Sequence, residues 1–221
     1  MVPDENMVVT EYLHVRYEVP NEQLGMIAGP CHAEEVALER LSYLTIGCTE
    51  KENAQVMAQL FETPFVHTTG SDDVWGLEYS SVMKNIYAIA SGICYGLKYG
   101  DNFQAVLAAN AVQEMNRFIN ATYPTHRDIN GSAYLGDLLV TTYSQFSRNR
   151  QFGNMLGRGY SVKTAQLEME MIAEGYYGSK CIHDFNERFH VDLPIADAVY
   201  DILYRHASPS LTIQSLTNQL K

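Results

Sequence analysis

The sequence predicts a mainly α-helical protein that begins with a smaller α/β part. From Ser71 onward almost every stretch repeats its apolar residues with helical spacing. Before that point, short apolar runs alternate with helical ones, which is the pattern of strand–helix–strand units. At 221 residues, with 46% hydrophobic and 19% charged residues, the chain has the composition of an ordinary globular protein with ample core.

The α/β part is weakly patterned at first, where Val8-Val9 and Tyr12-Leu13 are expected to begin a short strand and a helix. Gly29-Pro30 ends the first apolar run, and the residues from Thr49 to Glu52 form a capping-box pattern. We therefore expect strands and helices to alternate over residues 24–28, 32–40, 43–48, 49–61 and 65–68.

The helical part opens at Ser71-Asp72-Asp73, residues that are good helix N-caps. Proline suits the first turn of a helix, as at Pro194 and Pro209. Helices are expected over residues 74–97, 102–121, within 131–143, and over 147–156, 161–170, 178–189, 195–204 and from 208 onward. A domain boundary near residues 71–76 would divide the chain into residues 1–75 and 76–221.

Lys84 is the only charge between Val82 and Cys94, a run that is apolar on nearly every helical face. Such a helix is usually buried, and a buried ammonium is costly unless it is paired or faces a polar cleft. The alternative is a lysine at the helix edge whose stem packs while its head reaches water.

Charge and cysteine usage narrow the class of protein. A net charge of −11 argues against nucleic acid or an anionic membrane as the main partner, although a few local cations can still hold an anionic substrate. The four cysteines are scattered, which favours reduced thiols in a cytoplasmic protein over disulfides or a metal site. The chain has no signal peptide and no apolar run long enough to span a bilayer, so no integral membrane association is expected.

Five short motifs occur in a fixed order. They are Gly29-Pro30-Cys31-His32-Ala33, Leu77-Glu78-Tyr79 with Met83-Lys84-Asn85, Tyr99-Gly100-Asp101-Asn102, Gly136-Asp137-Leu138 and Ser147-Arg148-Asn149-Arg150. Each motif is weak alone, but the ordered set resembles the bacterial NAD(P)-dependent glycerol-3-phosphate dehydrogenases. The resemblance covers the chain from about Gly25.

This resemblance implies a C-terminal all-helical domain of the 6-phosphogluconate-dehydrogenase type, preceded by the tail of a Rossmann domain. The dinucleotide fingerprint GxGxxG is missing from the chain. The family begins with roughly a hundred further residues that carry it, together with a lysine in a Lys-Gly segment. We therefore expect the sequence to be a fragment that is inactive alone.

The family reaction is the reversible reduction of dihydroxyacetone phosphate to sn-glycerol 3-phosphate for phospholipid synthesis, with NAD or NADP as the cofactor. By resemblance, Lys84 is the catalytic proton donor or acceptor, and Asp137 lies near it and the substrate hydroxyls. Asn85 and Thr141 would contact the substrate, Thr141 because it lies four residues after Asp137 on the same helical face. Without the resemblance, the alternative for Asn85 is a polar residue on the helix surface that bonds water. The alternative for Asp137 is a carboxylate in a structural ion pair or a helix cap.

Ser147, Arg148 and Asn149 resemble the family's phosphate clamp, where a helix N-terminus and a guanidinium favour an anion. Arg148 would also contact the cofactor. The alternative is a surface basic cluster of Arg148 with Arg150 and Arg158.

Three further segments are implied to line the site. Gly29 and Cys31 would contact the substrate and Ala33 the cofactor, although Cys31 replaces a serine or asparagine and puts one side-chain hydrogen bond in doubt. Ile172 and Glu174 align with positions near the cofactor; Glu174 also reads as a solvated loop carboxylate. A catalytic role for His32 is disfavoured because no nucleophile pattern accompanies it, and the histidines lack metal-ligand spacing.

The resemblance also implies a homodimer. Two alternatives remain open: a non-catalytic helical module that dimerises and binds the phosphate substrate, and a related hydroxyacid or 6-phosphogluconate-type dehydrogenase. Neither the preference between NAD and NADP nor the geometry of a dimer follows from the sequence.

Overall fold

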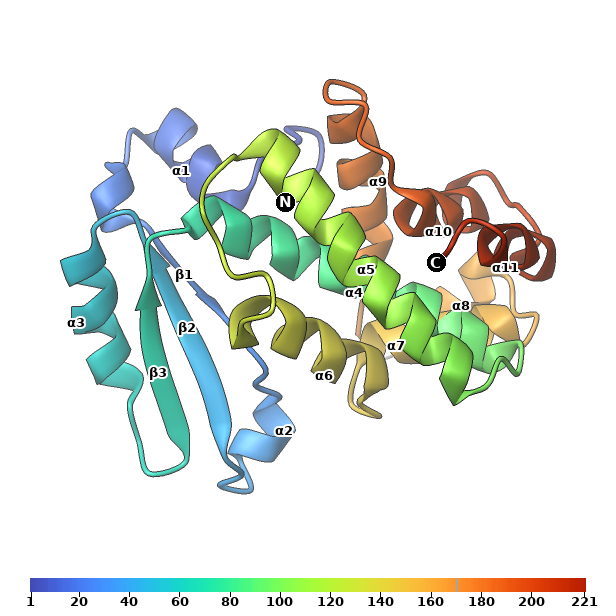
Figure 1. Cartoon of the computed structure of the whole chain (residues 1–221), viewed down its shortest axis with the longest axis horizontal. Helices are drawn as coiled ribbons and strands as arrows, with labels where there is room; N and C mark the ends of the chain where they lie inside the picture. The colour runs from blue at the N-terminus through green and yellow to red at the C-terminus, as the bar shows by residue number, and fades with distance from the viewer. Residues whose placement is uncertain (170) are drawn as a thin grey trace.

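A small mixed sheet and a larger helical body make up the molecule, as Figure 1 shows for the computed structural model, which describes residues 1–169 and 171–221. The strands lie in the order β1-β2-β3, with β1 antiparallel to β2 and β2 parallel to β3. Helix α3 packs against β2 and β3, whereas α4 contacts β1 and β2. The elements of this part are α1 (Val9–Tyr17), a 3-10 turn (Asn21–Gln23), β1 (Gly25–Ala28), α2 (Ala33–Val36), β2 (Ser42–Cys48), α3 (Lys51–Phe61) and β3 (Val66–Ser71).

Two local expectations for this part are wrong. Val8-Val9 begins no strand, because Val9 is already the first residue of α1. The capping box at Thr49 does not form: Glu50 is the N-cap residue of α3, and its side chain makes no capping bond. The helix nevertheless ends at Phe61 as expected, so the apolar periodicity predicts its extent without help from a capping box.

The helical body contains the elements α4 (Val74–Gly96), α5 (Asp101–Thr122), a π-helical turn (Ser132–Gly136), α6 (Asp137–Tyr143), α7 (Arg148–Gly157), α8 (Val162–Glu168), α9 (Gly175–Asn186), α10 (Pro194–Tyr204) and α11 (Pro209–Thr217). The expectation of a mainly helical chain with a small α/β part is confirmed. Both prolines begin their helices. The helix expected over 161–170 ends at Glu168, and its last expected residue, Glu170, lies outside the described residues.

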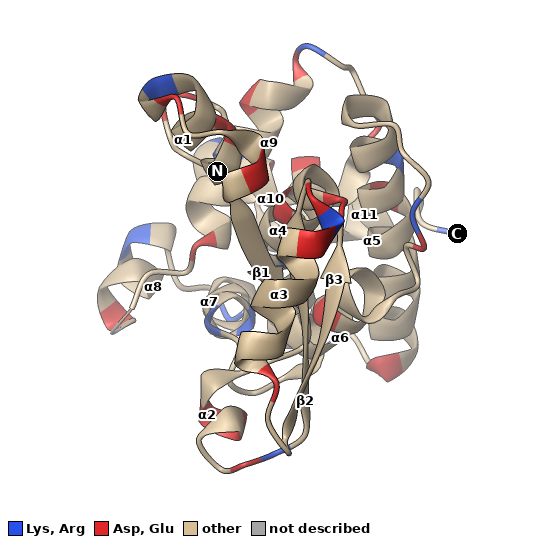
Figure 2. Cartoon of the chain, turned by 90° about the vertical axis from the view of Figure 1, so that its left-hand side faces the viewer, with Lys and Arg blue, Asp and Glu red and all other residues tan. Residues whose placement is uncertain are grey.

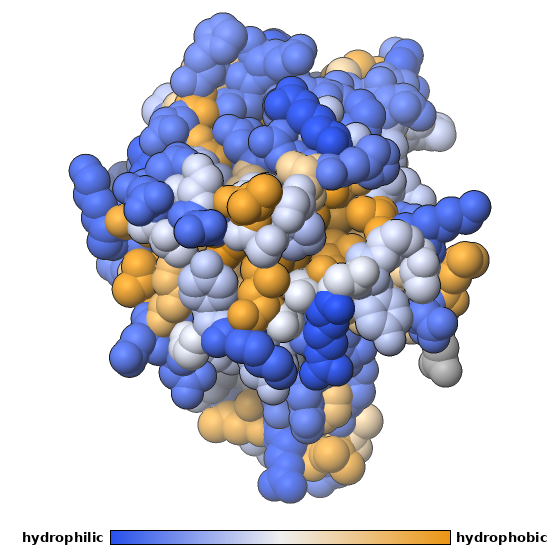
Figure 3. Space-filling model, turned by 90° about the vertical axis from the view of Figure 1, so that its right-hand side faces the viewer, coloured by the Kyte–Doolittle hydropathy of each residue, from blue (hydrophilic) through white to orange (hydrophobic). Residues whose placement is uncertain are grey.

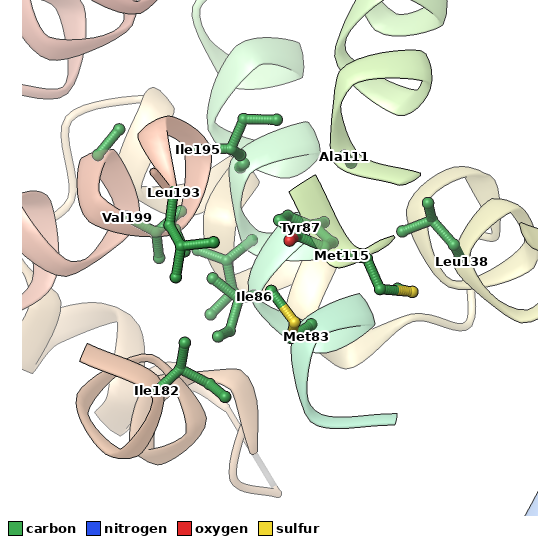
Figure 4. Close-up of a cluster of buried hydrophobic side chains, with 14 of the residues drawn as sticks. Met83, Ile86, Tyr87, Ala111, Met115, Leu138, Ile182, Leu193, Ile195 and Val199 are labelled. Atoms are coloured by element: carbon green, nitrogen blue, oxygen red, sulfur yellow. The ribbon is translucent and has the colours of Figure 1, made fainter. Parts of the chain in front are cut away.

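Helix α4 is the centre of the body. Met83, Ile86 and Tyr87 are fully buried, and Figure 4 shows them surrounded by side chains of α5, α6, α9 and α10. Burying an aliphatic or aromatic side chain contributes about 1.5–3 kcal/mol, so this core fixes the orientation of α4 firmly. A polar residue on α4 therefore has a defined direction.

Helices α4 and α7 cross in backbone contact because glycines lie at the crossing. A Cβ added to Gly92 would lie 2.1 Å from the carbonyl oxygen of Arg150, and one added to Gly153 would lie 2.1 Å from that of Ile89. Neither position tolerates a side chain. This crossing places the first turn of α7 beside the middle of α4.

The surface facing away from the sheet is largely hydrophilic, with apolar side chains gathered toward the middle of the view in Figure 3. None of the helices in residues 1–169 and 171–221 combines the length and hydropathy needed to cross a membrane.

Candidate active site between the sheet and the helical body

Lys84 and Asp137 form an ion pair where the sheet meets the helical body. The ammonium nitrogen of Lys84, on α4, lies 2.6 Å from each carboxylate oxygen of Asp137, the first residue of α6. The backbone N–H of Gly29 donates to Oδ2 of the same carboxylate at 3.1 Å. The Asp137 side chain is only 3% exposed while that of Lys84 is 21% exposed, so the lysine is the accessible member of the pair and the carboxylate stays shielded.

Local structure on both sides holds Asp137 in place. The hydroxyl of Thr141 donates to the backbone carbonyl of Asp137 at 2.6 Å, as expected for a residue one turn further along the same helical face. Gly29 has a φ of +124°, and a Cβ there would lie 2.5 Å from the carbonyl oxygen of Tyr43. Glycine is therefore required for the turn after β1 to bring its N–H to the carboxylate.

A second polar chain runs from α4 to α9. The side-chain amide of Asn149 donates to the Oδ1 of Asn85 at 2.9 Å, and its own Oδ1 accepts from the backbone N–H of Gly175 at 2.8 Å. The Asn85 amide nitrogen donates to the carbonyl of Ser81. Asn149 is buried and Asn85 half-buried, so the chain fixes the direction of Asn85 beside Lys84.

The first turn of α7 is built as the sequence predicts, with Ser147 as its N-cap residue. The Ser147 hydroxyl oxygen accepts from the backbone N–H of Arg150 at 3.3 Å. The Arg148 side chain is exposed and its Nη1 lies 3.7 Å from the sulfur of Met171. Basic residues gather on α7, which Figure 2 shows in blue, in a chain that is acidic overall.

The residues expected near a cofactor differ in exposure and line separate cavities. Cys31 is half-buried and Ala33 is exposed at the first turn of α2. Glu174 and Asn85 line a cavity of about 390 Å³, whereas Ile172, which is 63% exposed, lines a second cavity of about 260 Å³. Burial raises the pKa of Glu78 in the wall of the first cavity, where its carboxylate accepts bonds from Thr10.

The structure thus joins Lys84, Asp137, Gly29 and Thr141 in one cluster and connects Asn85 with Asn149 in another. The Arg148 side chain contacts Met171, so its proposed contacts with substrate and cofactor stay predictions. The ring of His32 packs edge-on against Phe146, 6.1 Å between centroids. Among the described residues no three His, Cys, Asp or Glu side chains are arranged to hold a metal ion.

Sequence reasoning missed two features of the site. Gly175 lies so close to α4 that a Cβ would be 2.6 Å from the carbonyl oxygen of Asn85; its place at the end of Met171–Gly175 was the available signal. The buried contact of Asp73 with Arg127 and Tyr134 had no signal, because these residues are far apart in the chain.

The ion pair of Lys84 and Asp137 thus lies between the helical body and the turn that follows β1. The sequence profile described as "NAD-dependent glycerol-3-phosphate dehydrogenase C-terminus" matches residues 73–214, well over half of the chain. The chain belongs to the NAD-dependent glycerol-3-phosphate dehydrogenase family.

Bacterial relatives and a solved structure support this family assignment. The chain is 36% identical to "Glycerol-3-phosphate dehydrogenase [NAD(P)+]" of Syntrophomonas wolfei over 90% of its own length and 58% of the relative's. The protein of the same description from Desulfotalea psychrophila is also 36% identical, over 96% and 62%. The chain therefore spans about three-fifths of the length of these curated relatives.

The glycerol-3-phosphate dehydrogenase of Coxiella burnetii superposes with a TM-score of 0.90 at 29% identity, over 97% of this chain and 65% of that one. The structure of DsGPDH of Dunaliella salina gives a TM-score of 0.85 over 94% of this chain and 37% of that one, and at 21% identity it supports the fold alone.

Proposed function

We propose that this chain is the substrate-binding and catalytic part of an NAD(P)-dependent sn-glycerol-3-phosphate dehydrogenase, which interconverts dihydroxyacetone phosphate and sn-glycerol 3-phosphate for phospholipid synthesis. The observation that carries the proposal is the Lys84–Asp137 pair, with its shielded carboxylate and its accessible amine. The division into residues 1–75, the remnant of the nucleotide-binding part, and residues 76–221, the substrate part, belongs to the same proposal.

Lys84 would act on the oxygen at C2 of the substrate. In the reducing direction its ammonium donates a proton to the carbonyl oxygen while a hydride reaches the carbon; in the oxidising direction its amine accepts the hydroxyl proton. Asp137 accepts from the amine at 2.6 Å and orients it, with Gly29 and Thr141 holding the carboxylate and its backbone. Asn85, fixed by Asn149, would donate to a substrate oxygen.

The phosphate of the substrate would bind at the first turn of α7. Ser147 caps this turn, Arg148 supplies a guanidinium that can hold two phosphate oxygens, and the positive end of the helix favours an anion. In this proposal Cys31 contacts the substrate only through its backbone.

Ala33, Arg148, Ile172 and Glu174 are the residues that would hold the nicotinamide end of NAD or NADP. In this proposal the exposed apolar side chain of Ile172 would contact the nicotinamide ring, and Glu174, which lines a cavity together with Asn85, would accept from its amide. When bound, the cofactor supplies or takes up the hydride. The chain has no GxGxxG loop for the pyrophosphate, so the fit concerns only the nicotinamide end.

The test is an assay of NADH and NADPH oxidation with dihydroxyacetone phosphate, run with the 221-residue chain and with the same chain joined behind the GxGxxG-bearing part of a relative, each with and without Lys84→Ala. The 221-residue chain alone is expected to show no turnover, and turnover of the joined protein that Lys84→Ala abolishes would support catalysis by Lys84. Turnover unchanged in Lys84→Ala would contradict the role of Lys84. Parallel assays with 3-hydroxyacyl and sugar-acid substrates separate the related dehydrogenases.

The second candidate function, a non-catalytic module that binds the substrate, is favoured by the three-stranded sheet and the missing GxGxxG loop. It predicts binding of dihydroxyacetone phosphate without turnover.

We further propose a homodimer, which the family resemblance implies and which gel filtration with light scattering would test. A cytoplasmic location is supported by four free cysteines.

A further inference from the structure

Asp73 is the centre of a buried polar network that the reaction proposed above does not use. Its carboxylate accepts from Nε of Arg127 at 2.7 Å, from Nη2 of Arg127 at 3.1 Å and from the hydroxyl of Tyr134 at 2.5 Å. The side chains of Arg127 and Asp73 are 3% and 8% exposed. A fork-shaped, charge-assisted contact of this kind is geometrically specific, and burial strengthens it.

The network joins the two elements that carry the ion pair of the candidate active site. Asp73 is the N-cap residue of α4 and accepts from the backbone N–H of Gly76 at 3.2 Å, so it fixes the start of the helix that carries Lys84. Tyr134 lies in the π-helical turn that runs directly into Asp137. A single carboxylate thus contacts both the helix of the lysine and the turn that delivers the aspartate.

The π-helical turn needs such support. Each of its backbone hydrogen bonds spans five residues instead of four, and such turns are rare. Short π-helical segments recur at functional sites. The Tyr134 side chain is buried, and its hydroxyl donates to Asp73.

The surroundings of Asp73 and Tyr134 determine the protonation state of each side chain. Burial raises the pKa of Asp73, but hydrogen bonds from Arg127 and Tyr134 outweigh burial and hold that pKa below its usual value. Burial and the neighbouring Asp73 carboxylate raise the pKa of the Tyr134 hydroxyl, which therefore remains a donor at neutral pH. The network consequently keeps one arrangement over the physiological pH range.

We propose that Asp73, Arg127 and Tyr134 are positioning residues that hold the π-helical turn and α4 in register, and so set the contact between Lys84 and Asp137. The functional meaning of this proposal rests on the proposed dehydrogenase reaction; the geometric claim does not. Loss of the Tyr134 hydroxyl should loosen Asp137 and alter the environment of the Lys84 ammonium, although neither residue is touched.

The test compares Tyr134→Phe with Tyr204→Phe. Each variant loses one tyrosine hydroxyl bond, because the Tyr204 hydroxyl donates to the carbonyl of Tyr176 at 2.8 Å, far from Asp73 in the sequence. The readout is the ¹⁵N-detected side-chain NH₃⁺ resonance of Lys84 in the 221-residue chain, assigned by its disappearance in Lys84→Arg. Thermal unfolding of each variant records the purely structural loss.

We expect the Lys84 resonance to shift or broaden in Tyr134→Phe and to stay unchanged in Tyr204→Phe. An unchanged Lys84 resonance in Tyr134→Phe, or an equal change in both variants, would overturn the proposal. If Tyr134→Phe does not fold, Arg127→Lys is measured in its place, because it keeps the charge and loses the forked contact. Titration of the wild-type chain with dihydroxyacetone phosphate tests the dehydrogenase proposal separately, since the Lys84 resonance is observed without substrate.

Discussion

Glu114 and Asp137 are both almost completely buried, and their carboxyl groups are stabilised in different ways. Glu114, on α5, is 0% exposed, and its two oxygens accept from the backbone N–H groups of Ile195 and Ala196 at 2.9 Å each. Asp137 is 2% exposed, and its oxygens face the ammonium of Lys84 and the N–H of Gly29. One carboxyl group is bound by two backbone N–H groups, and the other by a lysine ammonium together with one backbone N–H.

The difference in binding partners separates a carboxyl group that stabilises the fold from one that belongs to the candidate active site. Glu114 caps the start of α10 from another helix and has no route to solvent, so its contribution is to stability. Asp137 is paired with a titratable group that is 21% exposed and can reach a ligand. A buried carboxylate alone is therefore no sign of an active site; the accessible partner is.

The largest loss of stability is expected at Glu114. Glu114→Ala leaves two buried N–H groups without an acceptor and opens space in the core, which should cost about 4 kcal/mol in the free energy of unfolding. Urea unfolding measures this loss of stability. Gln113→Ala, at an exposed position on the same helix, is the control and should stay within about 0.5 kcal/mol of wild type. A loss below about 1 kcal/mol at Glu114 would refute the capping role.

A smaller loss is expected at the active-site pair. Lys84→Met leaves the Asp137 carboxylate shielded and unpaired; because water reaches the lysine position, we expect about 2–3 kcal/mol, below the range for a fully buried pair. Lys84→Met with Asp137→Leu should recover part of it, since two apolar residues replace the pair. Strictly additive losses in this double-mutant cycle would mean that the two side chains do not interact.

The pH dependence of stability should report the protonation of Glu114. Burial raises the pKa of Glu114 from 4.5 to about 8, against the opposing effect of its two backbone bonds. The folded state then holds a proton that the unfolded state releases, so this contribution to stability is complete below pH 4.5 and is lost as the pH rises toward 8. Urea midpoints from pH 5 to 8 should therefore fall less steeply in Glu114→Gln than in wild type; parallel profiles would argue against it.

The smallest effect is expected beside Asp137. Thr141→Val removes the 2.6 Å bond to the backbone carbonyl of Asp137 and should cost about 1 kcal/mol. Thr142→Val is the matched control, since its hydroxyl bonds the carbonyl of Leu138 in the same way at 2.9 Å. Both variants should lose similar stability, and only Thr141→Val should weaken binding of dihydroxyacetone phosphate. Equal weakening in both would remove Thr141 from the site.

Much of the fold could be predicted from the sequence because its signals are local. The apolar periodicity of α4 and α5 and the prolines of α10 and α11 placed those helices to within a residue or two. The π-helical turn before Asp137 could not be predicted, because its sequence also fits the first turn of an α-helix. It depends on Asp73, more than fifty residues earlier in the chain, through the hydroxyl of Tyr134.

The site was predictable through its motifs but not through its contacts. The sequence indicates Lys84 because it is a lone charge in an apolar helix. Its contact with Asp137, and that of Asp137 with Gly29, could not be predicted because the three residues lie in distant segments of the chain. Asn149 was expected to contact substrate; its amide instead connects Asn85 with Gly175, and its proposed contact with substrate stays a prediction. Arg148 is exposed and contacts Met171, so its proposed contacts with substrate and cofactor also stay predictions.

Calorimetric titration of dihydroxyacetone phosphate into the wild-type chain, Lys84→Met and Lys180→Met tests most directly whether the lysine–aspartate pair is the substrate site. Lys180 is exposed and pairs with Asp184 on α9, so it controls for the loss of one positive charge. The account predicts that binding disappears in Lys84→Met and is unchanged in Lys180→Met. Equal binding by all three proteins would contradict it.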